Sequence, residues 1–178
     1  MKKKVYLFID KNIDNSINEI IKYKNISIIY RNYSQNYQNE FLNIFNITKK
    51  HKIPLFVSYH QSLIKKYKVD GFYIPSFFKR KIYVNSKIFL IGSAHNYREI
   101  YEKQKQGCKI IFISPMFGED HKKIGVIKFN LITNNFKSLF CGLGGINIEN
   151  IKRIQLTKSV GISGIRIINN LKFINKLI

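Results

Sequence analysis

Residues 139–151, with the sequence LFCGLGGINIENI, contain the pattern that decides the fold of this chain. The apolar run Leu139–Cys141 predicts a strand, the glycines after it predict a tight turn, and residues 146–149 open an amphipathic helix with Asn147 as N-cap. Glycines leave main-chain N–H groups uncovered, and a helix N-terminus carries partial positive charge, so a phosphate fits at this junction. A turn that binds nothing is the alternative, because glycines also serve such turns.

The length and composition describe one domain. The chain has 178 residues and a mean hydropathy of -0.16, so we expect a single barrel-sized domain over residues 1–178. The first apolar run ends at Asp10, which is too early for a signal peptide, and no later run is long enough to cross a membrane. We therefore expect a cytoplasmic protein without a membrane partner. Cys108 and Cys141 form no CxxC pair, which argues against a disulfide framework or a zinc site.

The net charge indicates an anionic partner without specifying it. The chain carries 31 Lys and Arg against 10 Asp and Glu, a formal charge of +21. Such an imbalance suggests nucleic acid, but the lysines are spread among Asn and Ile without the spacing of known nucleic-acid motifs. We therefore expect a small anionic ligand and consider nucleic acid the less favoured partner.

Strand and helix patterns alternate along the whole chain. The predicted strands are apolar throughout, as in parallel sheets covered on both faces. The alternation predicts a compact (β/α)₈ barrel, with an open parallel sheet as the alternative because about 250 residues is typical for the barrel. The segment 75–86 shows no helical period, whereas helices are expected at 148–157 and 171–178. The eight predicted strands are residues 5–10, 26–31, 54–59, 71–74, 88–94, 109–114, 137–141 and 164–168.

The barrel rule then selects the residues that follow each strand. In such barrels the ligand lies at the carboxyl ends of the strands, and phosphate is commonly bound after strands seven and eight. The rule selects Arg31, Ser58, Tyr59, Tyr73, Ser93, His95, residues 115–123, Gly144, Gly145 and residues 168–170.

Four segments stand out at the predicted strand ends: IGSAH at 91–95, SPMFGEDHKK at 114–123, GLGGI at 142–146 and GISGIRIIN at 161–169. They resemble the thiamine phosphate synthase and TenI family of small barrels. Their order and spacing match the Ser-x-His strand end, the loop that ends in Lys, the double-glycine turn and the last strand of that family.

For the synthase branch, the resemblance implies a pyrimidine diphosphate, Mg²⁺ and a thiazole phosphate. The metal ligands of that branch are two Asp residues, after strands three and four. The first Asp and its Asn neighbour are replaced here by Ser58 and Tyr59, residues 73–78 contain no carboxylate, and the strand-two Lys is replaced by Tyr33. Because Mg²⁺ prefers carboxylate and phosphate oxygen, we expect no metal site and no cofactor, with Mg²⁺ needed only if synthase activity is retained.

For TenI-like members, the resemblance implies isomerisation of a thiazole carboxylate phosphate tautomer. It assigns the proton transfer to His95, because imidazole titrates near neutral pH, and places Ser93 beside the ligand. A histidine that merely caps the following helix is the alternative. The phosphate would be bound by the main chain of Gly144, Gly145, Ile168 and Asn169.

Two basic residues complete the predicted site. Lys122 takes the place of the family's loop Lys, although Lys123 beside it is an equal alternative. The planar guanidinium group of Arg31 is suited to donating two parallel hydrogen bonds to a carboxylate or diphosphate. Glu119, Asp120 and His121 are not expected to bind a metal, because three consecutive residues rarely converge on one ion.

The leading hypothesis is therefore a TenI-like thiazole tautomerase that binds a small phosphorylated heterocycle. The alternatives are a divergent thiamine phosphate synthase and a non-catalytic phosphate-ligand binding protein. Oligomeric state is open.

Overall fold

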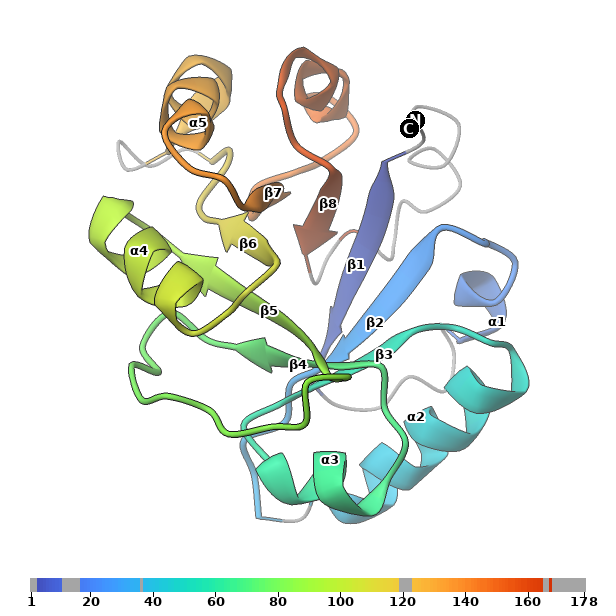
Figure 1. Ribbon diagram of the computed structural model, residues 1–178. Helices are drawn as coiled ribbons and strands as arrows, with labels where there is room; N and C mark the ends of the chain where they lie inside the picture. The colour runs from blue at the N-terminus through green and yellow to red at the C-terminus, as the bar shows by residue number, and fades with distance from the viewer. Residues whose placement is uncertain (1–2, 11–16, 36, 119–122, 165–166, 168–178) are drawn as a thin grey trace.

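The computed structural model describes residues 3–10, 17–35, 37–118, 123–164 and 167, and shows a closed barrel of eight parallel strands (Figure 1). The strands are β1 (Lys4–Ile9), β2 (Ile26–Tyr30), β3 (Leu55–Ser58), β4 (Gly71–Ile74), β5 (Phe89–Ala94), β6 (Ile110–Ile113), β7 (Leu139–Leu143) and β8 (Gly161–Gly164). The predicted barrel is thereby confirmed.

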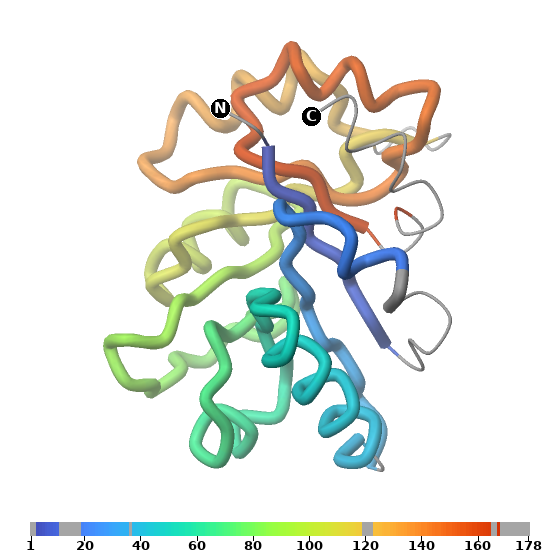
Figure 2. Tube along the Cα trace, turned by 90° about the vertical axis from the view of Figure 1, so that its right-hand side faces the viewer, coloured from blue at the N-terminus to red at the C-terminus, as the bar shows by residue number. Residues whose placement is uncertain are grey.

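Closure of the sheet excludes the open alternative. β8 pairs with β7 on one side, where Gly142 lies opposite Ile162, and with β1 on the other, where Lys4 lies opposite Gly161. Figure 2 shows the first strand (blue) beside the last (red) in a view at right angles to Figure 1. All carboxyl strand ends therefore lie around one mouth of the barrel.

The helices cover the outside of the barrel (Figure 1). None of those among the described residues has the length and hydropathy of a membrane span. They are α1 (Ile17–Ile20), α2 (Gln38–Lys50), α3 (Gln61–Lys66), α4 (Tyr97–Lys105), α5 (Gly125–Asn134) and the 3₁₀ helix η1 (Ile151–Leu156).

The barrel interior is filled with aromatic rings. Tyr6 and Phe112 meet edge to face with ring centroids 5.1 Å apart, and Phe8 meets Tyr73 at the same distance. Glycine makes room for such rings, since a methyl group at Gly71 would lie 2.5 Å from the Phe56 ring. Edge-to-face contacts add to the free energy gained by burial, so these rings stabilise the barrel beneath the mouth.

The connection between β4 and β5 contains no helix, as the missing period predicts (Figure 1). Two buried side chains hold it instead, one from α4 and one from the residue that follows α4. Lys103 Nζ donates to the Phe78 carbonyl at 2.7 Å, and Gln106 Nε2 donates to the carbonyls of Phe78 and Arg80 at 3.0 and 2.9 Å. Burial lowers the pKa of Lys103 to about 8.

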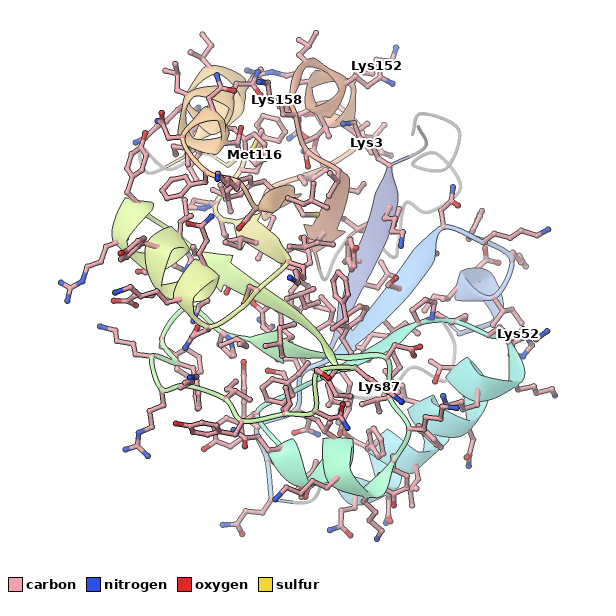
Figure 3. The ribbon with its side chains drawn as sticks, in the orientation of Figure 1. Lys3, Lys52, Lys87, Met116, Lys152 and Lys158 are labelled. Atoms are coloured by element: carbon pink, nitrogen blue, oxygen red, sulfur yellow. The ribbon has the colours of Figure 1, made fainter. Side chains whose placement is uncertain are left out.

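A cavity of about 700 Å³ lies between this helix-free connection and α2 and α3. Its wall includes Lys49, Lys65, Lys68 and Lys87. Asp70 and the residues before β5 place it toward the amino ends of the strands, away from the mouth that the sequence selects. Lysines occur on many elements, and Figure 3 labels Lys52 after α2, Lys87 before β5, Lys152 in η1 and Lys158 before β8.

Two predicted elements near the end of the chain need correction. The eighth strand begins at Gly161 and ends at Gly164, so the predicted span 164–168 starts three residues too late. The predicted α-helix at 148–157 is a turn followed by the 3₁₀ helix Ile151–Leu156, in which the Arg153 amide bonds to the Asn150 carbonyl three residues back. The predicted helix at 171–178 lies outside the described residues.

Candidate functional site

The double-glycine turn lies at the carboxyl end of β7, beside the end of β8. Leu143 pairs with Ser163 of β8, and the Gly144 amide is 3.5 Å from the Ser163 carbonyl oxygen. Gly144 and Gly145 have φ values of 85° and 69°, a region in which glycine is favoured because it has no Cβ. Two glycines in succession thus bend the main chain sharply at the mouth.

The loop after β6 packs directly on this turn. Met116 and Phe117 donate their amides to the carbonyls of Leu143 and Gly144, at 2.8 and 3.1 Å. A methyl group at Gly145 would lie 1.8 Å from the Phe117 carbonyl oxygen, closer than any atom tolerates. Residue 145 must therefore be glycine while the loop holds this position.

Two main-chain N–H groups of the turn have no hydrogen-bond partner among the described residues. The amides of Gly145 and Ile146 make no main-chain or side-chain hydrogen bond to another described residue. Asn150 stabilises the turn, because its side chain accepts a hydrogen bond from the Asn147 amide at 3.0 Å and donates one to the Gly145 carbonyl at 2.8 Å. Successive unpaired amides in a bend of this kind form a concavity that attracts anions.

Asn147 stabilises the chain after the turn, although no α-helix begins there. Its side-chain oxygen accepts from the amides of Glu149 and Asn150, both at 3.1 Å. The predicted cap thus acts on a single turn rather than on an α-helix. The predicted α-helix at this junction is therefore wrong, and phosphate binding by the turn amides stays a prediction.

His95 follows β5 directly and is exposed at the same end of the barrel. Its amide donates to Glu99 Oε2 at 2.8 Å, and Asn96 caps α4 by accepting from the Glu99 amide at 2.9 Å. Its Nδ1 lies 2.8 Å from the Ser114 carbonyl oxygen. A carbonyl only accepts hydrogen bonds, so the proton of the neutral ring belongs on Nδ1 and Nε2 keeps a free lone pair.

Ser114 connects this histidine to the glycine turn. Its carbonyl binds the His95 ring, while its hydroxyl would lie 3.2 Å from a methyl group placed on Gly144. Ser114 itself is attached to β5 through its amide, which bonds to the Ala94 carbonyl at 3.2 Å. One residue therefore brings the predicted proton carrier and the predicted phosphate turn together, which the sequence alone did not reveal.

Ser93 lies below the mouth, in the barrel interior. It is 4% exposed, and its hydroxyl accepts a hydrogen bond from Tyr73 at 2.8 Å. Burial raises the pKa of Tyr73 to about 12, so the phenol stays neutral and keeps donating. In this arrangement Ser93 orients Tyr73, and its direct contact with a ligand stays a prediction.

Arg31 already holds a carboxylate. Its Nε and Nη2 donate to the two Asp10 oxygens at 2.9 and 2.8 Å, and its guanidinium lies 5.2 Å from the Phe8 ring centroid. The hydrogen bond to Asp10 raises the pKa of Arg31 further. Arg31 thus forms the predicted pair of hydrogen bonds to a carboxylate, but this carboxylate belongs to a residue of the chain itself. That residue, Asp10, follows β1, and no sequence motif identified it.

Three predicted site residues lie outside the described residues. They are Lys122, Ile168 and Asn169. The same holds for residues 119–121. Their roles stay predictions.

Among the described residues at the mouth, the potential ligands do not fit a magnesium site. No group of three or more potential metal ligands occurs among the described residues. The ends of β3 and β4 offer hydroxyl and aromatic groups, and the carboxylate of Asp10 is paired with Arg31. Mg²⁺ requires several hard oxygen ligands, which these described residues do not offer.

The fold defines the chain as a small (β/α)₈-barrel protein with a double-glycine turn after β7. The family model described as thiamine monophosphate synthase (TMP-TENI) matches residues 5–169, and the chain belongs to this family. The thiamine-phosphate synthase of Ruminiclostridium cellulolyticum is 30% identical over 142 residues, which cover 75% of this chain and 65% of that protein. That of Clostridium novyi is 27% identical over 159 residues, covering 84% and 73%.

Solved structures agree on the fold. The thiamine phosphate pyrophosphorylase from Pyrococcus furiosus superposes with a TM-score of 0.78 at 19% identity, covering 98% of this chain and 94% of that chain. The protein of the same name from Bacteroides thetaiotaomicron superposes with a TM-score of 0.73 at 14% identity, covering 99% and 97%. At these identities the likeness establishes the barrel alone.

Proposed function

We propose that this chain binds a thiazole phosphate at the barrel mouth and acts as a TenI-like tautomerase, with His95 as the proton carrier. The observation that carries the proposal is the position of Ser114: its carbonyl oxygen lies 2.8 Å from His95 Nδ1, and its hydroxyl lies 3.2 Å from where a methyl group on Gly144 would stand. A base and an anion site held by one residue are suited to moving a proton on a ligand anchored by its phosphate.

The proposed chemistry is an isomerisation. The phosphate is bound by the amides of Gly145 and Ile146, which fixes the ring over the mouth. Nε2 of neutral His95 takes a proton from the tautomer, and the imidazolium returns a proton at another atom of the same ligand, which leaves the aromatic thiazole. Protons and electrons balance within the ligand, and no cofactor is needed.

Incubation of the purified chain with the thiazole carboxylate phosphate tautomer tests the proposal. We expect accelerated aromatisation that falls by about 10²-fold or more in His95→Ala. His51→Ala is the matched control, because His51 is also exposed but follows α2 at the opposite end of the barrel. Full activity in His95→Ala, or none in the wild-type chain, contradicts the catalytic role.

A divergent thiamine phosphate synthase is the second candidate, and the names of the relatives favour it. The absence of carboxylates after β3 and β4 opposes it. Mg²⁺-dependent release of pyrophosphate from the pyrimidine diphosphate, in the presence of thiazole phosphate, would establish this reaction. A binding isotherm for thiazole phosphate without either turnover would instead support a non-catalytic binding protein.

A further inference from the structure

The cavity beside α3 exists because the connection between β4 and β5 is a loop instead of a helix (Figure 1). Phe78, Ile82 and Val84 of this loop pack on the barrel core in place of a helix. A helix with its side chains is about 10 Å wide, whereas the loop is one chain thick. A hollow of about 700 Å³ therefore remains between the loop and α3, the size of a site for a small organic ligand.

The wall of the cavity before β5 is held by the chain's own hydrogen bonds. Asn85 Oδ1 accepts from the Lys87 amide at 3.0 Å, and the Asn85 carbonyl accepts from the Ile88 amide at 2.9 Å. The Phe89 amide then bonds to the Asp70 carbonyl, which joins this turn to the start of β4. A ligand entering the cavity therefore need not order this wall, and preformed sites of this kind lose little affinity to ordering.

Four lysines from separate segments surround the cavity, and their charge is unbalanced. Lys49, Lys65, Lys68 and Lys87 are exposed, and none of them forms an ion pair with a carboxylate among the described residues. The carboxylate of Asp70, which also lines the cavity, accepts a hydrogen bond from the Leu55 amide at 2.9 Å. The excess of like charges around one hollow attracts an anion that carries more than one negative charge.

The floor of the same cavity is apolar. Val69 is 6% exposed, and Ile64 and Ile88 are half-buried against the barrel core. A flat ring that covers these side chains removes their remaining apolar surface, and its own, from water. A bare phosphate would not use this floor, so the lining favours a ligand that has both a ring and several charges.

We propose that this cavity is a second ligand site, which binds an aromatic ring joined to a diphosphate group, the chemistry of a nucleoside diphosphate. The ring would lie on the apolar floor, and the lysines would bind the phosphates. The cavity lies toward the amino ends of the strands, whereas the glycine turn lies at the carboxyl end of β7. The inference therefore does not rest on the proposed function.

Titration with three probes in the presence of EDTA tests the ligand class. They are ADP, adenosine, which lacks the charges, and inorganic pyrophosphate, which lacks the ring. We expect ADP to bind at least about tenfold more tightly than either of the other two, because it uses both the floor and the lysines. Pyrophosphate binding as tight as that of ADP would show that the floor takes no part, and overturns the inference.

A double variant locates the binding. Lys65→Gln with Lys87→Gln removes one charge from α3 and one from the turn before β5, and both side chains are exposed, so the variant should fold. We expect its ADP affinity to fall at least about tenfold.

The matched control removes the same number of charges elsewhere. Lys128→Gln with Lys152→Gln changes exposed residues of α5 and η1, and Figure 3 shows Lys152 well away from Lys87. We expect this control to bind ADP like the wild-type chain. Equal ADP affinities in the two double variants overturn the inference, because the effect would then come from net charge alone.

Further outcomes separate this site from the barrel mouth. Excess thiazole phosphate should leave the ADP affinity unchanged, whereas displacement of ADP would place ADP at the mouth and overturn the inference. ADP binding that depends on the cavity lysines, in a chain that does not bind thiazole phosphate, would refute the proposed function and leave the cavity site standing. Tight binding of oligouridylate without binding of ADP would assign the lysines to nucleic acid and refute the inference.

Discussion

Replacing Gly145 by alanine is expected to displace the loop after β6, whereas the same change at Gly144 should leave it in place. Both residues have positive φ, at 69° and 85°, where a side chain costs about 1–2 kcal/mol. The sites differ in space. A methyl group at Gly145 would lie 1.8 Å from the Phe117 carbonyl oxygen, which is backbone, whereas at Gly144 the nearest atom is the rotatable Ser114 hydroxyl at 3.2 Å.

Thermal melting and calorimetric titration measure the expected difference between the Gly144→Ala and Gly145→Ala variants. Gly144→Ala should lower the melting temperature by about 2–8 °C, as about 1–2 kcal/mol does in a chain of this length. In Gly145→Ala the distance between the new methyl group and the Phe117 carbonyl oxygen must also increase, from 1.8 Å to at least 3.0 Å. This shift strains the hydrogen bond from the Phe117 amide to the Gly144 carbonyl. We expect thiazole phosphate to bind at least about tenfold more weakly to Gly145→Ala than to Gly144→Ala, by calorimetric titration. Equal affinities in the two folded variants would refute this reasoning.

Two other predictions concern stability. The pKa of Lys103 is lowered from 10.5 to about 8, so between these pH values the unfolded chain binds more protons than the folded chain. The free energy of unfolding should therefore rise with pH across this window, by up to about 3 kcal/mol relative to Lys103→Met. Urea denaturation at several pH values measures this rise. A constant difference between the two proteins from pH 8 to pH 10 would contradict this. Asn147→Ala removes the side chain that accepts from two amides and should cost about 1 kcal/mol in the same assay, whereas an unchanged midpoint would show that the turn needs no cap.

The alternation of strands and helices was readable because each strand is an unbroken apolar run. The last strand was misplaced because residues 164–168 are richer in isoleucine than the true strand, Gly161–Gly164. Glycine is required at residue 161, where a methyl group would lie 2.4 Å from the Lys4 carbonyl oxygen. That requirement is tertiary, so no local preference reveals it.

The site was readable in part. The rule that ligands lie at carboxyl strand ends selected His95 and the glycine turn, and the same rule applied to β1 would have found Asp10. The contact between His95 and Ser114 joins residues 19 apart in sequence and depends on the loop after β6. Periodicity and motif spacing carry no information on such loop contacts, which is why Ser114 was not singled out.

The most direct test of the central claim is the structure of the chain crystallised with thiazole phosphate. The account predicts that the phosphate oxygens lie within hydrogen-bond distance of the Gly145 and Ile146 amides, with the thiazole ring facing His95. A phosphate found instead among the lysines of the cavity beside α3, with the glycine turn empty, would contradict the account.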